Sequence, residues 1–291
     1  MDVIAQIILA GLIMGGIYAL IALGLNLIYG TMRLLNVAHG ELIMFGAFAA
    51  YWMYTIHQLS PLFSLLLVAV GSALFGVVIF FGLFNPLIKK SQSQDTMSAN
   101  SLLIFFALSI IMQNVAVYLW GANLRSYSYM SKVIPVAGIP VTANRLLSFT
   151  IGVVLCVGCY LLIQKTMVGK AIRAVIQDRE CCKLMGVNVI KIYVISFAIS
   201  FAMAGIAGVL LSMFYVFSPF MGLPYTVIAF IVVILGGMGN IGGSLLAGFI
   251  LGLVSSVGTA LTSPGLESVI SYLIFILVVL FKPKGIFGKG Y

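Results

Sequence analysis

The sequence predicts an all-α polytopic membrane protein with about eight to ten transmembrane helices. Of its 291 residues, 63% are hydrophobic and only 7% are charged, and the mean hydropathy is +1.22. A water-soluble domain of this length would expose much of that apolar surface, so the composition excludes a soluble protein. The apolar runs are too long for buried strands and lack the alternation of an outer-membrane barrel. Helices are therefore the expected spanning elements.

Charge-free stretches give the positions of the predicted helices. A helix needs roughly 20 apolar residues to cross the hydrocarbon core, so the longer stretches must hold two or more crossings each. Turn-like pairs such as Ser60-Pro61, Ser218-Pro219 and Ser263-Pro264 divide them. Asp, Glu, Lys and Arg are absent from residues 3–32, 42–88, 96–124, 146–164 and 192–266. The nine predicted spans are 4–29, 37–56, 62–84, 98–120, 146–164, 191–215, 224–238, 243–261 and 266–281.

The polar stretches between these spans do not resemble linkers between soluble domains. The longest of them are 89–100, 121–145 and 165–191. Residues 1–291 are therefore expected to form a single transmembrane domain. Met1-Asp2 directly precedes an apolar run, without a basic n-region or a cleavage site, so the first span is expected to be retained.

The basic residues predict the orientation, because short cytoplasmic loops retain Lys and Arg. If 165–191 is cytoplasmic, 12 of the 15 Lys and Arg residues lie inside, and only Arg125, Lys132 and Arg145 lie outside. The N-terminus is then periplasmic and the C-terminus cytoplasmic. The net charge of +9 is spread over loops rather than gathered on one face, so no nucleic acid is expected as a partner.

Two glycine-bearing segments interrupt the apolar pattern in corresponding positions of the two halves. Residues 28–46 and 234–248 each contain a glycine-bearing break between apolar runs. Transporters built from inverted repeats carry such paired interruptions near their pathway, and chance similarity between Gly- and Leu-rich segments is the alternative. The match of 237–242 to G-x-G-x-x-G predicts no dinucleotide site, because its flanks are membrane spans and the next acid is Glu267.

Two further glycine patterns are typical of closely packed membrane helices. They are Gly11-x-x-x-Gly15 in the first predicted span and Gly248-x-x-x-Gly252 in the eighth. Small residues four apart let two helix backbones approach each other, so packing is the expected role of both.

A polar stretch, LNVAHGE at 35–41, lies between the first two predicted spans. Histidine and carboxylate groups at membrane depth are functional candidates by default. Arg33, His39 and Glu41 are expected to form one polar cluster that supports the break, and the alternative is that they satisfy one another at the cytoplasmic interface. For the asparagines of the pathway, polar helix packing is the alternative role. The candidate pathway or broken-segment residues are Asn26, Asn36, His39, Glu41, Gly236, Gly237 and Gly239.

The loop 165–191 holds six of the 15 basic residues and a helical spacing of apolar ones. Ile172, Val175 and Ile176, then Cys182 and Met185, recur with charges between them, which predicts a short amphipathic helix pair. Gly186 is expected to stop the second helix. The mixed charge of the pair favours a protein partner over a lipid surface.

Three stretches carry a resemblance to a known family. LNVAHGE (35–41), GKAIRAVIQDRECCKLMGVN (169–188) and GGMGNIGGSLLAG (236–248) resemble the signature segments of LivH-type permease subunits of branched-chain amino-acid ABC importers, in the same order over essentially the whole chain. The sequence departs from the family pattern at Val37, Arg179, Cys181-Cys182 and Gly242, which affects helix starts and turns.

The resemblance implies a multi-pass permease of the bacterial inner membrane that moves branched-chain or other neutral amino acids inward. Its implied partners are a second related permease, two cytoplasmic ABC ATPases, a periplasmic substrate-binding protein and membrane lipid. By position, 169–188 is the element that docks in a groove of the ATPase. The residues that the resemblance places in this coupling element are Gly169, Arg173, Asp178, Leu184 and Gly186.

The sequence contains no G-x-x-x-x-G-K-[ST] loop, so ATP is expected to be used by the partner subunits. His39 and His57 lack a nearby nucleophile motif or metal-ligand cluster, so no enzyme activity and no catalytic, cofactor or metal residue is expected. Two alternatives stay open. One is a urea or short-amide ABC permease, which shares these motifs, and the other is a secondary transporter with its own coupling-ion site.

The predicted orientation can be tested by labelling single cysteines. A cysteine introduced at Ser128, in a variant without the native cysteines, is expected to react with an impermeant thiol reagent in intact cells. The reason is the 12-to-three split of basic residues. Protection at Ser128 together with labelling at Gln92 would contradict the orientation.

Overall fold

The computed structural model describes the chain except for residues 1, 92, 137, 262–266, 283–284 and 289–291. The described part is helical apart from loops and one antiparallel hairpin, β1 (Val133–Val136) with β2 (Ile139–Thr142). This confirms an all-α membrane protein. The helical elements are α1 (Asp2–Met32), α2 (His39–His57), α3 (Pro61–Ile79), the π-helix η1 (Phe80–Phe84), α4 (Asn85–Lys90), α5 (Gln94–Trp120), α6 (Ala143–Lys165), α7 (Met167–Gln177), α8 (Arg179–Leu184), α9 (Val189–Ser212), α10 (Gly222–Gly236), α11 (Ile241–Leu261) and α12 (Glu267–Phe281).

Each of the nine predicted spans contains a helix, and the predicted turn at Ser263-Pro264 lies outside the described residues. Among the described residues, six helices are long and apolar enough to cross a membrane: α1, the continuous helix 61–90, α5, α6, α9 and α11. The helices in the other three predicted spans, α2, α10 and α12, are not among these six. α2 begins with His39 and Glu41, and α10 and α12 have 15 residues each.

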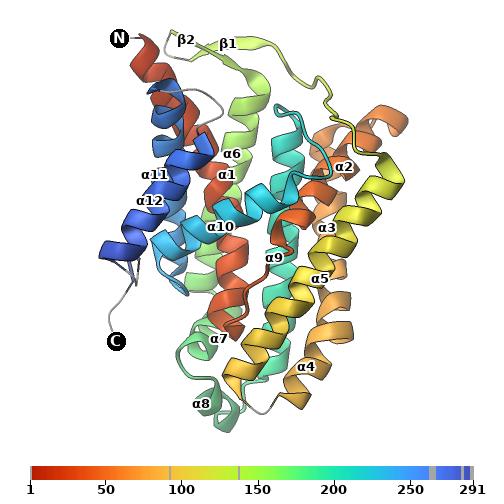
Figure 1. Ribbon diagram of the computed structural model, residues 1–291, viewed down its shortest axis with the longest axis vertical. Coiled ribbons are helices and arrows are strands. Elements are labelled where there is room, and N and C mark those ends of the chain that lie inside the picture. The colour runs from red at the N-terminus through yellow and green to blue at the C-terminus, as the bar shows by residue number, and fades with distance from the viewer. Residues whose placement is uncertain (1, 92, 137, 262–266, 283–284, 289–291) are drawn as a thin grey trace.

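α10 is too short to cross alone, since 15 residues rise only about 22 Å against a hydrocarbon thickness of about 30 Å. Figure 1 shows α10 running across the bundle rather than along it. The segment 33–38 leads from the end of α1 back toward the middle of the bundle before α2 begins (Figure 1). The first halves of α2 and α10 therefore meet inside the protein.

α1 and α9 form the centre of the bundle. In each of them 67% of the most apolar stretch is buried, against 22% in 61–90, 17% in α5 and 22% in α6. The outer helices therefore present most of their apolar surface to the surroundings of the protein, as expected in lipid or against another membrane subunit.

The two predicted glycine patterns pack against each other where α1 crosses α11. A Cβ at Gly11 or Gly15 would lie 2.8 Å from the Cα of Leu253 or Phe249 in α11. A Cβ at Gly252 would collide with the backbone of Gly15 in α1. The packing role predicted for these glycines is confirmed.

The predicted amphipathic pair is also present, as α7 and α8 at one end of the bundle (Figure 1). Ile172, Val175 and Cys182 are its buried side chains. Gly186 has a φ of +79°, the left-handed conformation that ends a helix and that glycine adopts most easily. The hairpin β1–β2 lies at the opposite end.

The close packing of α1 on α11 predicts that a methyl group added at the contact will destabilise the fold. Gly252→Ala is expected to lower the free energy of unfolding by roughly 1–3 kcal/mol, because the added Cβ has no room against α1. Thermal unfolding of the purified protein in detergent measures this. Gly71→Ala in α3 is the matched control, since no atom lies within 4 Å of a Cβ there. Equal stability of the two variants would refute the close packing.

Candidate functional site

The starts of α2 and α10 are joined by hydrogen bonds inside the bundle. The backbone N–H of Gly40 donates to Thr226 Oγ1 at 2.9 Å. The Thr226 hydroxyl lies 3.1 Å from the carbonyl oxygen of Val37 and 3.2 Å from that of Gly222, so it can donate to either. A single hydroxyl thus satisfies backbone groups at both helix starts, where four N–H groups per helix lack intrahelical partners.

Glu41 lies in the first turn of α2 and is only 1% exposed. Ser109 of α5 donates to its Oε1 at 3.0 Å. Its carboxyl group lies against Gly222, the first residue of α10, and any side chain at that position would collide with it. The positive ends of two helix dipoles therefore face this acid, and such ends favour negative charge.

His39 is fully buried at the start of α2. Its Nε2 lies 3.0 Å from the carbonyl oxygen of Ile21 in α1, so Nε2 carries the proton and donates. The ring packs beside Gly24, where a Cβ would lie 3.2 Å from His39 Cε1. His39 therefore ties the start of α2 to the middle of α1.

Arg33 is not part of this site, so the expected cluster of Arg33, His39 and Glu41 is wrong. Arg33 is exposed at the end of α1 with a φ of 56°, and among the described residues no ion pair joins it to either group. The alternative at the cytoplasmic interface is wrong as well. Residues 34–38 carry the chain back into the bundle, which separates the arginine from the two buried groups.

Asn36 is also buried at this junction, and its amide has no hydrogen-bond partner within the described part of the chain. The same holds for His39 Nδ1, Glu41 Oε2 and Ser200 Oγ of α9. Buried polar atoms are normally hydrogen bonded. The junction therefore offers free hydrogen-bonding capacity at the centre of an apolar bundle.

A second group of predicted residues meets at the break between α10 and α11. Gly237 and Gly239 have φ values of +89° and +84°, which only glycine adopts without strain. The buried Asn26 amide of α1 holds this turn. Its Oδ1 accepts from the N–H of Gly239 at 2.7 Å, and its Nδ2 donates to Asn240 O at 3.0 Å and to Ser244 Oγ at 2.6 Å.

The break is held from two further sides. The N–H of Ile286 donates to Leu235 O at 2.8 Å, and Asn240 Nδ2 donates to Phe287 O at 2.7 Å. Ile176 of α7 reaches the break from the other side. A Cβ at Gly30 of α1 would lie 3.2 Å from Ile176 Cδ1 and 3.3 Å from the Cα of Gly239. Gly236 packs closely on the start of α11, where a Cβ would lie 2.5 Å from the backbone nitrogen of Ser244.

Some of the residues predicted for the helix pair hold it against α6, and others are exposed. Arg173 donates to Gln164 Oε1 at 2.7 Å, and Gly169 packs on the carbonyl oxygens at the end of α6. Leu184 and Met185 are 89% and 83% exposed at the end of α8. The pair therefore rests firmly on α6 and projects an apolar tip.

Asp178 begins α8 as its N-cap. Its Oδ1 accepts from the N–H groups of Glu180 at 2.9 Å and Cys181 at 3.1 Å. These bonds, led by that of Cys181, hold the pKa of the Asp178 carboxyl below its usual value. The cap is thus fully formed at neutral pH and weakens only as the pH falls through that lowered pKa.

Arg179 connects α8 to two spans. Its guanidinium donates to Gln94 Oε1 at the start of α5, and Gln94 Nε2 donates to the carbonyl oxygen of Met32 at the end of α1 at 3.0 Å. No role was predicted for Gln94, Ser109, Gly222 or Thr226, and Ile176 was predicted only as part of the apolar face of the helix pair. The signal that could have found Ser109 and Thr226 is a hydroxyl inside an apolar span.

Because Glu41 and Gly222 are in contact, we expect the effects of substituting them on the free energy of unfolding to be non-additive. Gly222→Ala is expected to lower the free energy of unfolding by roughly 1–3 kcal/mol, because the new Cβ meets the Glu41 carboxyl group. Glu41→Ala is expected to destabilise too, and the double variant to lose about 0.5–3 kcal/mol less than the sum. Thermal unfolding of all three, with Gly158→Ala as an unhindered control, measures the coupling. Strict additivity would show that the two residues do not meet.

The family model for the branched-chain amino acid transport system permease component matches residues 7–279. The high-affinity branched-chain amino acid transport system permease protein BraD of Pseudomonas aeruginosa is 30% identical over 98% of this chain and 95% of its own length. LivH of Escherichia coli K12 is 28% identical over 96% and 94%, and the probable LivH of Methanocaldococcus jannaschii is 29% identical over 99% and 94%. The chain belongs to the family of branched-chain amino acid transport permease components, and it is a multi-pass membrane protein.

Proposed function

We propose that this chain is one of two related permeases of an ABC importer that carries branched-chain or other neutral amino acids across the bacterial inner membrane. Residues 1–291 act as one permease domain, a periplasmic binding protein delivers the substrate, and two cytoplasmic ATPases use ATP. The observation that carries the proposal is the projecting pair α7–α8 with its contact to the glycine break. The printed functions of the relatives support the substrate class.

The proposed orientation has the N-terminus outside and the C-terminus inside. Two groups of basic residues support it, because they lie at opposite ends of the bundle. Lys89 and Lys90 of α4 lie at the same end as α7 and α8, whereas 125–145 lies at the other end with the hairpin (Figure 1). Short cytoplasmic segments retain the larger share of Lys and Arg, which assigns the α7–α8 end to the cytoplasm.

The tip of α8 is the proposed docking point for an ATPase. Leu184 and Met185 present an exposed apolar surface at the end of α8, and the same short helix and its N-cap expose Asp178, Glu180 and Lys183, which carry both signs of charge. An apolar centre with a polar rim is typical of a protein interface. A helix that lies on anionic lipid would instead carry mainly basic residues on its polar face.

Two routes lead from this tip to the spans. One runs from Ile176 of α7 to Gly30 and Gly239, and so to the turn that Asn26 holds. The other runs from Arg179 through Gln94 to the end of α1. An ATPase that displaces α7 and α8 thus acts directly on the ends of α1, α5 and α10, which supplies contacts that can differ between transport states.

This coupling role predicts the behaviour of Asp178 variants. Asp178→Lys is expected to lower amino-acid uptake and substrate-stimulated ATP hydrolysis together, because it removes the α8 cap and reverses the charge beside the docking tip. The amount of permease in the membrane is expected to stay near that of the wild type, since α8 lies outside the spans. Uptake into proteoliposomes and ATPase activity of the assembled complex are the measurements.

Asp178→Asn is the matched control, because an asparagine can still cap the helix but carries no charge. Activity retained in Asp178→Asn and lost in Asp178→Lys assigns the effect to the cap or to the added positive charge. Asp178→Ala, which can neither cap the helix nor add a charge, separates these two. Normal uptake and normal stimulated ATPase activity in Asp178→Lys would mean that Asp178 has no coupling role. If deletion of 172–184 also left the ATPases bound and active, the pair would be a lipid-surface element.

A further inference from the structure

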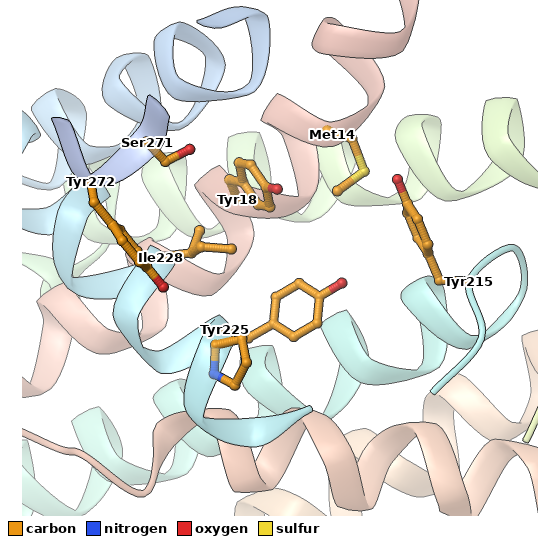
Figure 2. Close-up of a pocket in the computed structure, with 8 residues that line it drawn as sticks. Met14, Tyr18, Tyr215, Tyr225, Ile228, Ser271 and Tyr272 are labelled. Atoms are coloured by element: carbon orange, nitrogen blue, oxygen red, sulfur yellow. The ribbon is translucent and has the colours of Figure 1, made fainter. Parts of the chain in front are cut away.

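A cavity of about 180 Å³ opens between α1, α10, α12 and the segment after α9 (Figure 2). We propose that it binds the apolar side chain of the amino acid during transport. The inference rests on the proposed function and adds the place at which the permease itself contacts its substrate. The residues that line the cavity are Met14, Tyr18, Tyr215, Pro224, Tyr225, Ile228, Ser271 and Tyr272.

The residues that line the cavity suit a ligand in which an apolar group is attached to a polar one, as in an amino acid with an apolar side chain. Its side chains are uncharged, and four of the eight are tyrosines, which combine an apolar ring with a polar hydroxyl. In Figure 2 Met14 and Tyr18 of α1 lie across the cavity from Tyr225 and Ile228 of α10. Small-molecule sites are typically lined in this way, with apolar and aromatic walls and few polar groups. A charged solute would find no opposite charge in this wall.

The lining of the cavity is partly buried and partly exposed. Tyr18 and Ser271 are each only 3% exposed, and the Ser271 hydroxyl lies 3.1 Å from that of Ser255 in α11. Tyr215 and Tyr272 are 41% and 38% exposed. Tyr215 and Tyr272 lie on opposite sides of the cavity in Figure 2, with Tyr18 between them. A side chain that enters between the two exposed tyrosines therefore reaches the buried Tyr18, while its α-amino and α-carboxyl groups stay on the exposed side.

The volume selects small apolar groups. A cavity of roughly 150 Å³ lined by aliphatic and aromatic residues is large enough to bind benzene, whereas drug-sized ligands occupy roughly 300–1,000 Å³. A cavity of about 180 Å³ therefore accommodates a branched aliphatic side chain of three or four carbons.

The position of the cavity fits delivery from outside. In the proposed orientation, Tyr215 follows the outer end of α9, and Ser271 and Tyr272 lie in the outer half of α12. α10 contributes Pro224, Tyr225 and Ile228 from its first half and ends at the glycine break. One short helix thus joins the cavity to the turn against which Ile176 of α7 packs.

The test fills the cavity and compares the result with an equal substitution elsewhere. Ile228→Trp is expected to lower leucine uptake at least about tenfold, because the indole occupies the substrate's space. Ile111→Trp on the exposed face of α5 is the matched control and is expected to leave uptake unchanged. Both are measured in proteoliposomes that contain the complete importer and binding protein saturated with leucine. Wild-type uptake by assembled Ile228→Trp would overturn the inference.

A second variant covers the case in which Ile228→Trp does not assemble. Ile228→Ala enlarges the cavity and is expected to raise the ratio of phenylalanine to valine uptake about tenfold over wild type. The binding protein is saturated with each amino acid in turn, so its own selectivity cancels in the comparison. An unchanged ratio would overturn the inference. Failure of the wild-type complex to import any neutral amino acid would instead contradict the proposed function, and with it the cavity's role.

Discussion

The hydrogen bonds of the Asn26 amide are the interaction on which the inner end of the bundle depends. A membrane offers no water to an open turn, so every backbone group at the break between α10 and α11 needs a partner from the protein. Asn26 supplies both a donor and an acceptor from α1, one of the two most buried helices of the bundle. The turn can therefore lie beside α1 and α7, and α10 can end inside the protein rather than at its surface.

The same requirement explains the junction of α2 and α10. Two helix starts bring unpaired N–H groups together. Thr226 accepts from the N–H of Gly40, and Ser109 donates to the Glu41 carboxyl group beside them. Gly40 and Gly222 allow the approach, because side chains at either position would collide with the opposite helix. The polar residues of this family member thus gather where helices begin or break, and the uninterrupted spans stay almost free of charge.

The sequence predicted the parts of the fold that depend on local pattern. Charge-free runs located a helix in each of the nine predicted spans, six of which are long and apolar enough to cross a membrane within the described residues. Glycines four apart predicted the packing of α1 on α11, and apolar spacing predicted α7 and α8. It could not predict how Arg33 and Glu41 separate, because that depends on the three-dimensional path of the irregular segment 34–38 between α1 and α2. The partners of Asn26 and Ile176 lie far away in sequence, and no local pattern identifies them. Whether the two glycine breaks form an inverted repeat stays a prediction.

The segment Gly285–Phe287, near the end of the described chain, helps to hold the break between α10 and α11. The last residues of most domains can be trimmed or extended with little effect. Here Ile286 and Phe287 hydrogen-bond the break itself, and Gly285 lies against Gly237 with a φ of +83°. An affinity tag fused close behind these residues would pull on the turn that Asn26 holds. Purification handles therefore belong at the N-terminal end, where Val3 and Ile4 are well exposed.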